Sequence, residues 1–517
     1  MRFVLPFTRL RRWLPLLLLA ACGSADVPEG PPLSPTDAAW LDRLTWGASP
    51  ADLPEWRRLG RQGWIAAQLA SPPDTVRLPP DVQPLYDRLA DPAEGGNAAM
   101  VRLMEARRAS RQTKQQGDVD ASLAMFRAAN GEARDWFQRA VERSLVRDLH
   151  SQDQLREQLA WFWFNHFSIR FVGTGYGPLA NDYLERVIRP RALGRFCDLV
   201  HATQRHPAML LYLNNAQSRA GRINENYARE LLELHTMGVG SGYSQGDVQQ
   251  LARVLTGLTV DVAHWPAPPP PRGGWRDGLA LFDPALHDAG PKTVLGTRIT
   301  ASGLAGITQA TELACRQPAT AWRISYRLAQ YLLADAPPAA VVDAMAAEFR
   351  RSDGDIAAVL RLLFARPEFA ASLGTLYKDP NHYLLSAVRL MYFDRPISNP
   401  GELALLLRRL GQPRMERVTP DGWPLEAANW NASGQLDDRF KLAEALGRGG
   451  ERLYAGLDRG LIARARAELQ LTDLADVRVR SGIHARLAPA TAAAIDAAGS
   501  RRERNMLFLS SPEFMRR

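Results

Sequence analysis

Apolar residues recur every three to four positions along most of this 517-residue chain, which is the period of an amphipathic α-helix. The pattern covers residues 38–69, 97–115, 121–167, 191–212, 224–239, 244–258, 303–333, 339–349, 355–364, 381–393, 402–410 and 436–517. Helix-start signals agree with it: Pro207 follows His206 at a first helical position, and Ser244 with Asp247 matches a capping box. We therefore predict an all-α, multi-helix globular array.

Two long segments interrupt the helical pattern. Residues 261–300 are rich in Pro, Gly and Trp, and residues 411–435 contain the run PDGWP. Loops of this length in a compact protein are usually functional or disordered, and their tryptophans favour order. We predict two long ordered loops, with an N-terminal helical region over 37–260, the first loop over 261–300, and a C-terminal helical region over 301–517 packed on the first.

The first residues predict export. Four arginines within residues 2–12 precede a short apolar run over 14–20, and the sequence LAAC at 19–22 is a small-residue cleavage site that ends in Cys22. The apolar run is shorter than the ~20 residues of a spanning helix, and no later segment is suited to cross a membrane. We predict a lipoprotein signal peptide (1–21), lipidation of Cys22 and a flexible tether (22–36), which attach the protein to a membrane of the bacterial cell envelope, facing the periplasm or the cell surface.

Charge and cysteine content limit the possible partners. The net charge is +9, but the arginines are scattered among acidic residues without a recognition motif, so we predict no binding to nucleic acid. An acidic envelope polymer stays open as a partner. Once Cys22 is assigned to lipid, Cys197 and Cys315 remain. They suit a disulfide in an oxidising compartment, and their apolar helical contexts suit two separate buried thiols equally well.

The densest set of polar side chains lies in the segment 224–257, which begins NENYARELLELHTMG. On a helix that starts near Asn224, the side chains of Asn226, Glu230 and Glu233 share one face. Carboxylates held together in this way can divide acid and base roles or bind a cation. We predict that these three residues are catalytic.

Three further residues lie beside that face. Arg229 joins the predicted catalytic set, and Asn224 and Glu225 are predicted to bind ligand. A structural interpretation stays open, in which Arg229 forms ordinary ion pairs with Glu225 and Glu233 that hold helices together.

Three histidines extend the candidate site. His166 lies in the aromatic run WFWFNHF, where its ring must find a buried partner or face a cavity, and His206 either binds ligand or caps the helix after it. His235 follows the carboxylates but does not share a helical face with Glu233. We predict binding roles for His166 and His206.

The long loops add candidates. His287, Asp288 and Lys292 are charged residues in a segment where no packing period requires them, and we predict that they are catalytic. Trp423 in the second loop suits ligand stacking as well as loop anchoring. A divalent metal is a candidate cofactor, with Glu230, His166, His235 and His287 as candidate ligands.

Several motifs together resemble one family. The segment 224–238 is similar to the hallmark NENYARELLELHTLG of the bacterial family known as domain of unknown function 1800. Matches in order along the chain are LDRLTWG (41–47), FWFNHF (162–167), HPAML (206–210), His287-Asp288 with Gly290 and Lys292, PATA (318–321), GWP (422–424) and SPEF (511–514). The sequence departs at Gln317, where the family has His. The resemblance implies an exported bacterial protein, often found beside another uncharacterised exported family, and supplies no established activity.

Two functions follow from these residues. The first is an envelope enzyme, a hydrolase or lyase that uses a carboxylate and histidine site on an envelope polymer or a small polar substrate. The sequence lacks a Gly-x-Ser-x-Gly elbow, a phosphate-binding glycine loop, a His-Glu-x-x-His motif and a paired Cys-x-x-Cys site. The second function is a non-catalytic scaffold or binding protein that acts with another exported protein, its polar residues forming a buried structural network.

Overall fold

The computed structural model describes residues 31–517 apart from 456–458, 461, 464–471, 475–476 and 478–481. It is 61% helical and 4% strand, which confirms a mainly helical fold. The predicted signal peptide and Cys22, the predicted lipidation site, lie outside the described residues. Within the described residues, no helix combines the length and apolar character that crossing a membrane requires.

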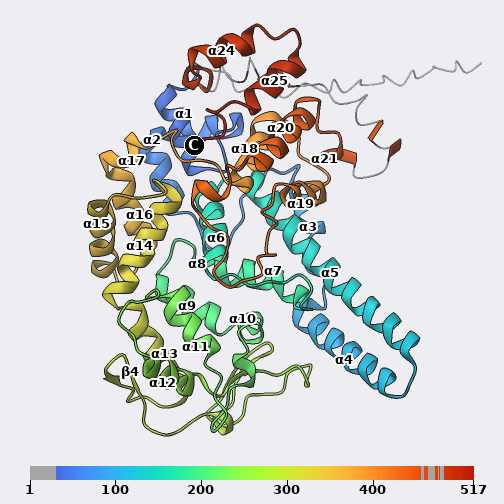
Figure 1. Cartoon of the computed structure of the whole chain (residues 1–517), viewed down its shortest axis with the longest axis vertical. Coiled ribbons are helices and arrows are strands. Elements are labelled where there is room, and N and C mark those ends of the chain that lie inside the picture. Colours follow the sequence, from blue (N-terminus) through green and yellow to red (C-terminus); the bar gives the residue numbers. More distant parts are fainter. Residues whose placement is uncertain (1–30, 456–458, 461, 464–471, 475–476, 478–481) are drawn as a thin grey trace, which may run out of the picture.

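The N-terminal elements form one end and the middle of the molecule (Figure 1). These helices are α1 (Pro35–Leu44), α2 (Leu53–Leu69), α3 (Gln83–Arg88), α4 (Gly95–Gln115), α5 (Val119–His150), α6 (Gln154–His166), α7 (Ala180–Asp182) and α8 (Arg189–Arg191), with a π-helical turn at Tyr183–Ile188 and 3-10 turns at Pro50–Asp52 and Gly177–Leu179. Helices α4 and α5 pack against each other as a hairpin that projects from the body.

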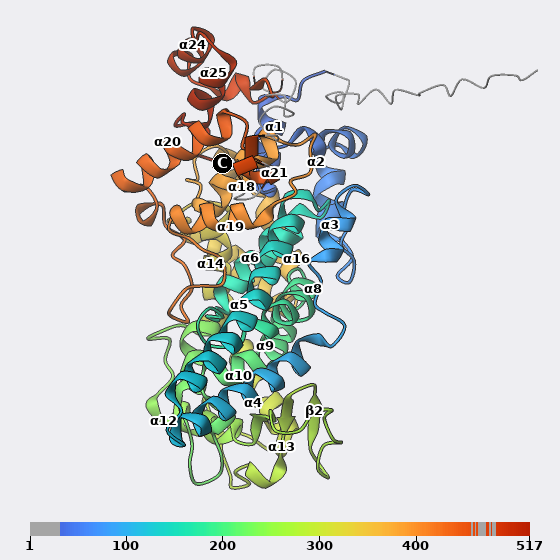
Figure 2. The same ribbon diagram turned by 90° about the vertical axis from the view of Figure 1, so that its right-hand side faces the viewer.

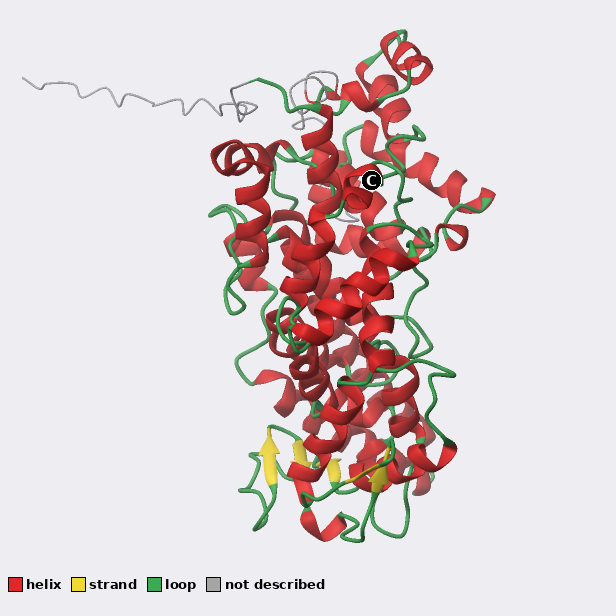
Figure 3. Cartoon of the chain, turned by 90° about the vertical axis from the view of Figure 1, so that its left-hand side faces the viewer, coloured by secondary structure: helices red, strands yellow, loops and turns green. Residues whose placement is uncertain are grey.

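The middle of the chain builds the opposite end. Its helices are α9 (Phe196–Gln204), α10 (Pro207–Tyr212), α11 (Asn226–Glu230), α12 (Gln245–Leu255) and α13 (Gly303–Cys315), with a 3-10 turn at Asn215–Gln217 and a π-helical turn at Leu231–His235. Strands β1 (Leu258–Val260), β2 (Trp275–Asp277) and β3 (Ala280–Phe282) form an antiparallel sheet in the order β1-β3-β2, and β4 (Thr293–Val294) pairs with β5 (Thr297–Arg298). Figure 3 shows these strands gathered at this end.

The remaining helices return along the body and form the first end again (Figure 2). They are α14 (Pro318–Leu332), α15 (Ala339–Arg351), α16 (Ile356–Ala365), α17 (Pro367–Ala371), α18 (Pro380–Met391), α19 (Pro400–Arg409), α20 (Ser433–Gly447), α21 (Arg452–Ala455), α24 (Pro489–Asp496) and α25 (Arg501–Leu509), with 3-10 turns at Ala427–Asn429 and His484–Arg486. A further 3-10 turn, Pro284–Leu286, lies between β3 and β4 in the middle of the chain. Helix α15 packs between α14 and α16, and α25 packs on α20.

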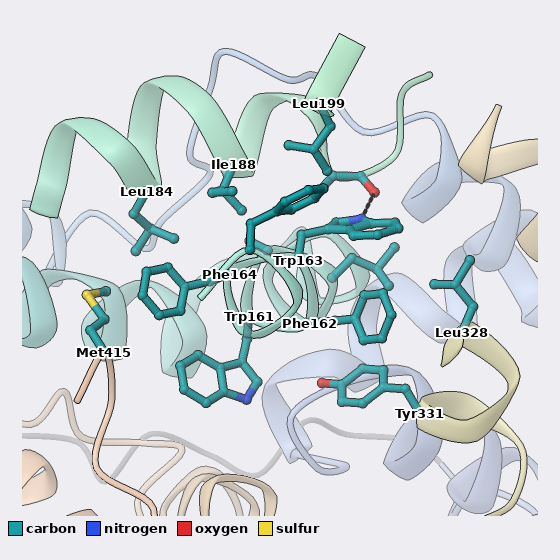
Figure 4. Packing of buried hydrophobic residues seen from close by; sticks show 14 of the residues in the cluster. Trp161, Phe162, Trp163, Phe164, Leu184, Ile188, Leu199, Leu328, Tyr331 and Met415 are labelled. Carbon is teal, nitrogen blue, oxygen red and sulfur yellow. Dashed lines mark hydrogen bonds between the residues drawn. The ribbon is translucent and has the colours of Figure 1, made fainter. Parts of the chain in front are cut away.

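Helix α6 is the centre of the hydrophobic core. Every residue from Gln154 to His166 is buried, because helices pack around the whole circumference of α6. Figure 4 shows Trp161, Phe162, Trp163 and Phe164 directed outward from α6 into apolar neighbours. Each ring of this size contributes about 1.5 to 3 kcal/mol by leaving water.

The predicted helix starts and one of the two cysteine interpretations are present in the structure. His206 caps α10 by accepting a hydrogen bond from the Ala208 N–H, and the capping box that Ser244 forms with Asp247 is present at the start of α12. Cys197 and Cys315 form a disulfide with a Cα–Cα distance of 5.8 Å, which joins α9 to α13 and resolves the two cysteine interpretations. The segment 261–300 differs from the predicted loop, because it contains the short strands β2 to β5.

Candidate functional site

The hallmark segment folds into two short helical pieces instead of one helix. Asn224 Oδ1 accepts a hydrogen bond from the Asn226 N–H at 2.9 Å, and α11 begins there. After Glu230 the chain widens into the π-helical turn Leu231–His235. The Oγ1 of Thr236 donates to the Leu231 carbonyl at 2.6 Å and stabilises the end of this turn. Single π-helical turns occur frequently at functional sites, so this departure from helical geometry directs attention to the side chains around it.

Arg229 forms the ion pairs that the structural interpretation anticipates. Its guanidinium lies 3.4 Å from Glu225 Oε2 and 3.4 Å from Glu233 Oε1, one helical turn to either side. It also donates a hydrogen bond of 2.8 Å to Gln245 at the start of α12. Arg229 is therefore ion-paired with both carboxylates and links α11 to α12.

Glu230 is different from both of these carboxylates. It is half-buried, and within the described part of the chain its side chain has no hydrogen bond or ion pair. Burial raises the pKa of its carboxyl, and the negative charges of Glu233 and Asp421 raise it further, while the positive charge of Arg229 partly opposes them. A carboxyl of this kind holds its proton to a higher pH than a solvated one and is suited to proton transfer.

Two arginines of α14 were missed by the sequence analysis. The Arg323 Nη2 donates to the Leu234 carbonyl in the π-helical turn at 3.1 Å, and its aliphatic part lies against Gly238. Arg327, one turn later, has no hydrogen bond or ion pair to another described residue. Burial lowers the pKa of the Arg327 guanidinium to about 10, with a smaller contribution from the charge of Arg323, while the negative charges of Glu426 and Asp421 partly oppose this shift.

A sequence signal for this pair exists. Helix α14 carries two arginines one turn apart and no acidic residue that could neutralise them. Arginine pairs of this kind are usually solvated, and only the tertiary arrangement shows that Arg327 is half-buried, with its Nε lacking a hydrogen-bond partner among the described residues.

The second long loop brings acidic residues to these arginines. Asn165 at the end of α6 donates from Nδ2 to the Trp423 carbonyl at 2.8 Å and accepts from the Trp423 N–H at 2.6 Å. Tyr212 Oη donates to the Val418 carbonyl at 3.0 Å and fixes the start of the loop. The loop thereby holds Asp421 near Glu230 and Arg327, where its charge acts on the pKa of both. We call Glu230, Glu233, Asp421, Arg323 and Arg327 the Glu230 cluster.

His166 and His235 are buried where the charge of Arg323 acts on both rings. The Nε2 of His166 is 3.0 Å from the His235 carbonyl, and because a carbonyl only accepts, Nε2 carries the proton. Burial lowers the pKa of the His166 ring, and the charges of Arg327 and Arg323 lower it further. Burial and Arg323 also lower the pKa of His235 to about 3, and neither of its ring nitrogens has a hydrogen-bond partner in the described residues. Both rings are therefore neutral.

The His287 segment lies on α12 and forms a local network. His287 Nδ1 is 2.8 Å from the Thr256 carbonyl, and Asp288 accepts hydrogen bonds of 2.8 and 3.0 Å from Arg253. Lys292 donates to the carbonyls of Asp288 and Gly290. These bonds hold the segment to the end of α12, and each of the three predicted catalytic residues His287, Asp288 and Lys292 has a partner within this network.

The remaining predicted residues have structural partners. Asn226 Nδ2 donates to the Leu213 carbonyl at 3.2 Å, and the Asn224 N–H donates to Ser218. His206 Nε2 is 3.0 Å from Asp182 while its Nδ1 caps α10, so both ring nitrogens are engaged. The indole of Trp423 is half-buried, with the Arg417 guanidinium 5.2 Å from its ring centroid.

The candidate metal ligands of the sequence analysis do not meet. Glu230, His166, His235 and His287 are held in three different settings, and the Nε2 of His166 is occupied by a carbonyl. Among the described residues, the one group of His, Cys, Asp and Glu side chains close enough to hold an ion is Cys197, His201 and Glu312. It lies between α9 and α13, away from the hallmark segment, and its cysteine is in the disulfide.

Comparison with known proteins gives one match. A family model described as a protein of unknown function (DUF1800) covers residues 39–516, nearly the whole chain. No curated protein and no solved structure matches the chain.

Proposed function

This chain belongs to the DUF1800 family of proteins of unknown function, and on that premise we propose a function from the Glu230 cluster. We propose a lipid-anchored protein of the bacterial cell envelope that binds an acidic envelope polymer through Arg323 and Arg327. It cleaves the polymer as a hydrolase or lyase, with Glu230 as the group that transfers the proton.

The observation that carries the proposal is the state of Arg327. Its side chain is half-buried, its Nε has no hydrogen-bond partner among the described residues, and the carboxylates of Glu426 and Asp421 act on its charge without forming an ion pair with it. An arginine desolvated without a partner is costly, and a carboxylate or phosphate of the ligand supplies the missing acceptors in bidentate geometry. Arg323 lies one turn away and adds a second positive charge, which favours an anionic group over a neutral one.

Glu230 supplies the chemistry. Its raised pKa increases the fraction of protonated carboxyl near neutral pH, which a general acid requires, and the ionised fraction acts as a base. No partner in the described residues occupies its oxygens, so they are available to a substrate. In this proposal Arg327 binds an anionic group of the polymer, and Glu230 transfers a proton at a bond near that group. The position of the anionic group then determines which bond is cleaved.

The proposed location depends on the N-terminal sequence. The run LAAC at 19–22 supplies both a cleavage site and the thiol for acylation. Cys22→Ser is expected to move the protein from the membrane fraction to the soluble fraction. Intact-mass analysis of the mature wild type without lipid on Cys22 would contradict the anchor and leave the Glu230 proposal to its own test.

A second function is favoured by ion pairs in which charged residues of the candidate site are already paired with each other. Arg229 is paired with Glu225 and Glu233, and Asp288 is paired with Arg253. Structural networks of this kind suit a non-catalytic scaffold or binding protein that acts with another exported protein.

Binding and cleavage of acidic oligosaccharides, one set bearing carboxylates and one bearing phosphates, separate these functions. Arg327→Ala is expected to weaken binding by about 10- to 100-fold, which corresponds to about 1.5 to 3 kcal/mol for a charge-assisted hydrogen bond. Arg298→Ala, at an exposed arginine of β5, is the control and should bind as the wild type does.

Glu230→Gln is expected to keep binding and lower the cleavage rate by about 100-fold or more. Glu225→Gln removes a carboxylate that Arg229 already neutralises, and it should retain cleavage. Binding of the oligosaccharides without cleavage by the wild type would favour the scaffold or binding protein. Binding that is unaffected by Arg327→Ala would contradict the anion site.

A further inference from the structure

The disulfide Cys197–Cys315 lies between two pockets. A pocket of about 240 Å³ is lined by both cysteines together with Phe196, Phe349 and other residues, so a small thiol can approach the sulfurs from that side. A second, more polar pocket of about 510 Å³ is lined by His201 and Glu312. The first pocket therefore gives a reductant access to the bond, and the second pocket is lined by potential metal ligands.

Two helices bring four ligand-type side chains to this point. On α9, Cys197 and His201 are one turn apart, and on α13, Glu312 and Cys315 are separated by three positions. The Sγ of Cys197 is 3.9 Å from His201 Nε2, which is 3.3 Å from Glu312 Oε1. These three ligand atoms lie within 4.8 Å of one another.

These separations suit zinc. Zinc binds thiolate sulfur at about 2.3 Å and imidazole nitrogen or carboxylate oxygen at about 2.0 to 2.2 Å, so tetrahedral ligand atoms lie roughly 3.3 to 3.8 Å apart. In the disulfide the sulfurs carry no negative charge, and the thiolate is the form that binds a metal. In the oxidised protein Cys197, His201 and Glu312 are already close together, and the Sγ of Cys315 joins them by rotation of its side chain once the disulfide is reduced.

We propose that reduction of the Cys197–Cys315 disulfide creates a zinc site from Cys197, His201, Glu312 and Cys315. A dithiol supplies two electrons and two protons by thiol–disulfide exchange: the S–S bond breaks, two cysteine thiols form, and the dithiol becomes a disulfide. When Zn²⁺ binds, each thiol releases its proton to solvent. The two thiolates balance the two positive charges of the ion, so the local net charge does not change.

The neighbouring ion pairs support the site. Arg195 lies 2.7 Å from Glu312 Oε2, and Arg316 lies 3.4 Å from the same oxygen. These pairs orient the carboxylate, whose Oε1 faces His201 and also accepts a hydrogen bond of 3.0 Å from Arg195, so Zn²⁺ takes the place of that bond when it binds. Hydrogen-bonded outer residues of this kind fix the orientation of metal ligands and raise metal affinity.

Metal content of the purified full chain tests the proposal. The protein is incubated with Zn²⁺, with or without a non-chelating phosphine reductant, then desalted and analysed for bound metal. One zinc ion per chain is expected in the reduced protein and none in the oxidised protein. With Co²⁺ in place of zinc, the reduced protein should develop thiolate-to-cobalt charge-transfer absorption.

Variants identify the ligands. His201→Ala and Glu312→Gln should each weaken zinc binding to the reduced protein by about tenfold or more. The double variant Cys197→Ser with Cys315→Ser should bind none, which also controls for Cys22. His264→Ala, at an exposed histidine of the 261–300 segment, is the matched control and should bind as the wild type does.

Circular dichroism of each variant in the oxidised state checks that it is folded before metal is added, and His201→Gln replaces His201→Ala if the alanine variant is unfolded. Equal zinc binding with and without reductant would overturn the proposal. So would a reduced wild type without zinc, or His201 and Glu312 variants that bind zinc normally.

Discussion

Asn165 and Trp423 exchange two hydrogen bonds across 258 residues of sequence, at 2.8 and 2.6 Å. The amide of Asn165 offers one donor and one acceptor, so it pairs with the Trp423 main chain as a neighbouring strand would. The residue before Trp423 must be glycine, because Gly422 has a φ of +77° and an added Cβ would lie 2.0 Å from the Asn165 carbonyl oxygen. This contact joins the core helix α6 to the loop that carries Asp421.

The first prediction tests that contact. Asn165→Ala removes both hydrogen bonds and should lower the free energy of unfolding by about 2 kcal/mol. Gly422→Ala should cost more, because main-chain atoms block the new methyl group. Urea denaturation measures both changes.

Gly434 provides the control for the glycine variant. It lies on α20, and a Cβ there would meet no atom within 4 Å. Gly434→Ala should therefore be neutral or stabilise by up to about 1 kcal/mol. If Gly422→Ala were as stable as Gly434→Ala, the close approach of the loop to α6 would be wrong.

The sequence allowed the helical fold to be predicted because the burial of α12, α14 and other amphipathic helices follows a local period. It also identified Glu230, which the structure leaves without a partner in the described residues. The same local patterns could not show that Glu230 and Glu233 have different environments. Arg229 forms ion pairs with Glu225 and Glu233 but not with Glu230.

The parts of the site that were missed depend on contacts between distant segments. Arg327 approaches Asp421 only after α14 and the second loop fold onto α6. The network of Asp288 depends on Arg253, 35 residues earlier on another element. A sequence pattern shows that a charged residue is present, and the tertiary fold decides whether it is neutralised.

The second prediction concerns Glu230 and stability. Its folded-state pKa is raised above the unfolded value, so ionisation of Glu230 disfavours the folded state as the pH rises through the folded pKa. At pH 7, Glu230→Gln should therefore be as stable as the wild type or more stable. The difference should shrink as the pH falls toward the unfolded value, where the carboxyl is protonated in both states.

Glu225→Gln serves as the comparison at the same pH. It loses the ion pair with Arg229 and should be slightly less stable, by up to about 1 kcal/mol. Thermal melts of both variants between pH 4 and 7 give the two profiles. A large loss of stability in Glu230→Gln at pH 7 would show that Glu230 has a structural partner and would remove the basis for its proposed role.

The third prediction concerns the disulfide. Cys197 and Cys315 are separated by 118 positions, so their bond restricts the unfolded chain over a long loop. Replacing both with serine should lower the free energy of unfolding by about 2 to 5 kcal/mol. Wild type unfolded in a reductant is the control and should match the double variant. A loss below about 0.5 kcal/mol would mean that the bond is absent from the folded protein.

The last prediction concerns acid. Burial, together with Arg323, lowers the pKa of His235 to about 3, whereas an unfolded histidine titrates near its model value of 6.5. Below that value the unfolded state binds a proton that the folded state excludes, so His235 reduces stability by up to about 1.4 kcal/mol per pH unit as the pH falls. His235→Phe should flatten the stability profile between pH 6.5 and 4 by that slope. Phe167→Leu, which alters packing at a ring 5.1 Å from His235, should lower stability equally at every pH. Parallel profiles for wild type and His235→Phe would contradict a neutral, buried His235.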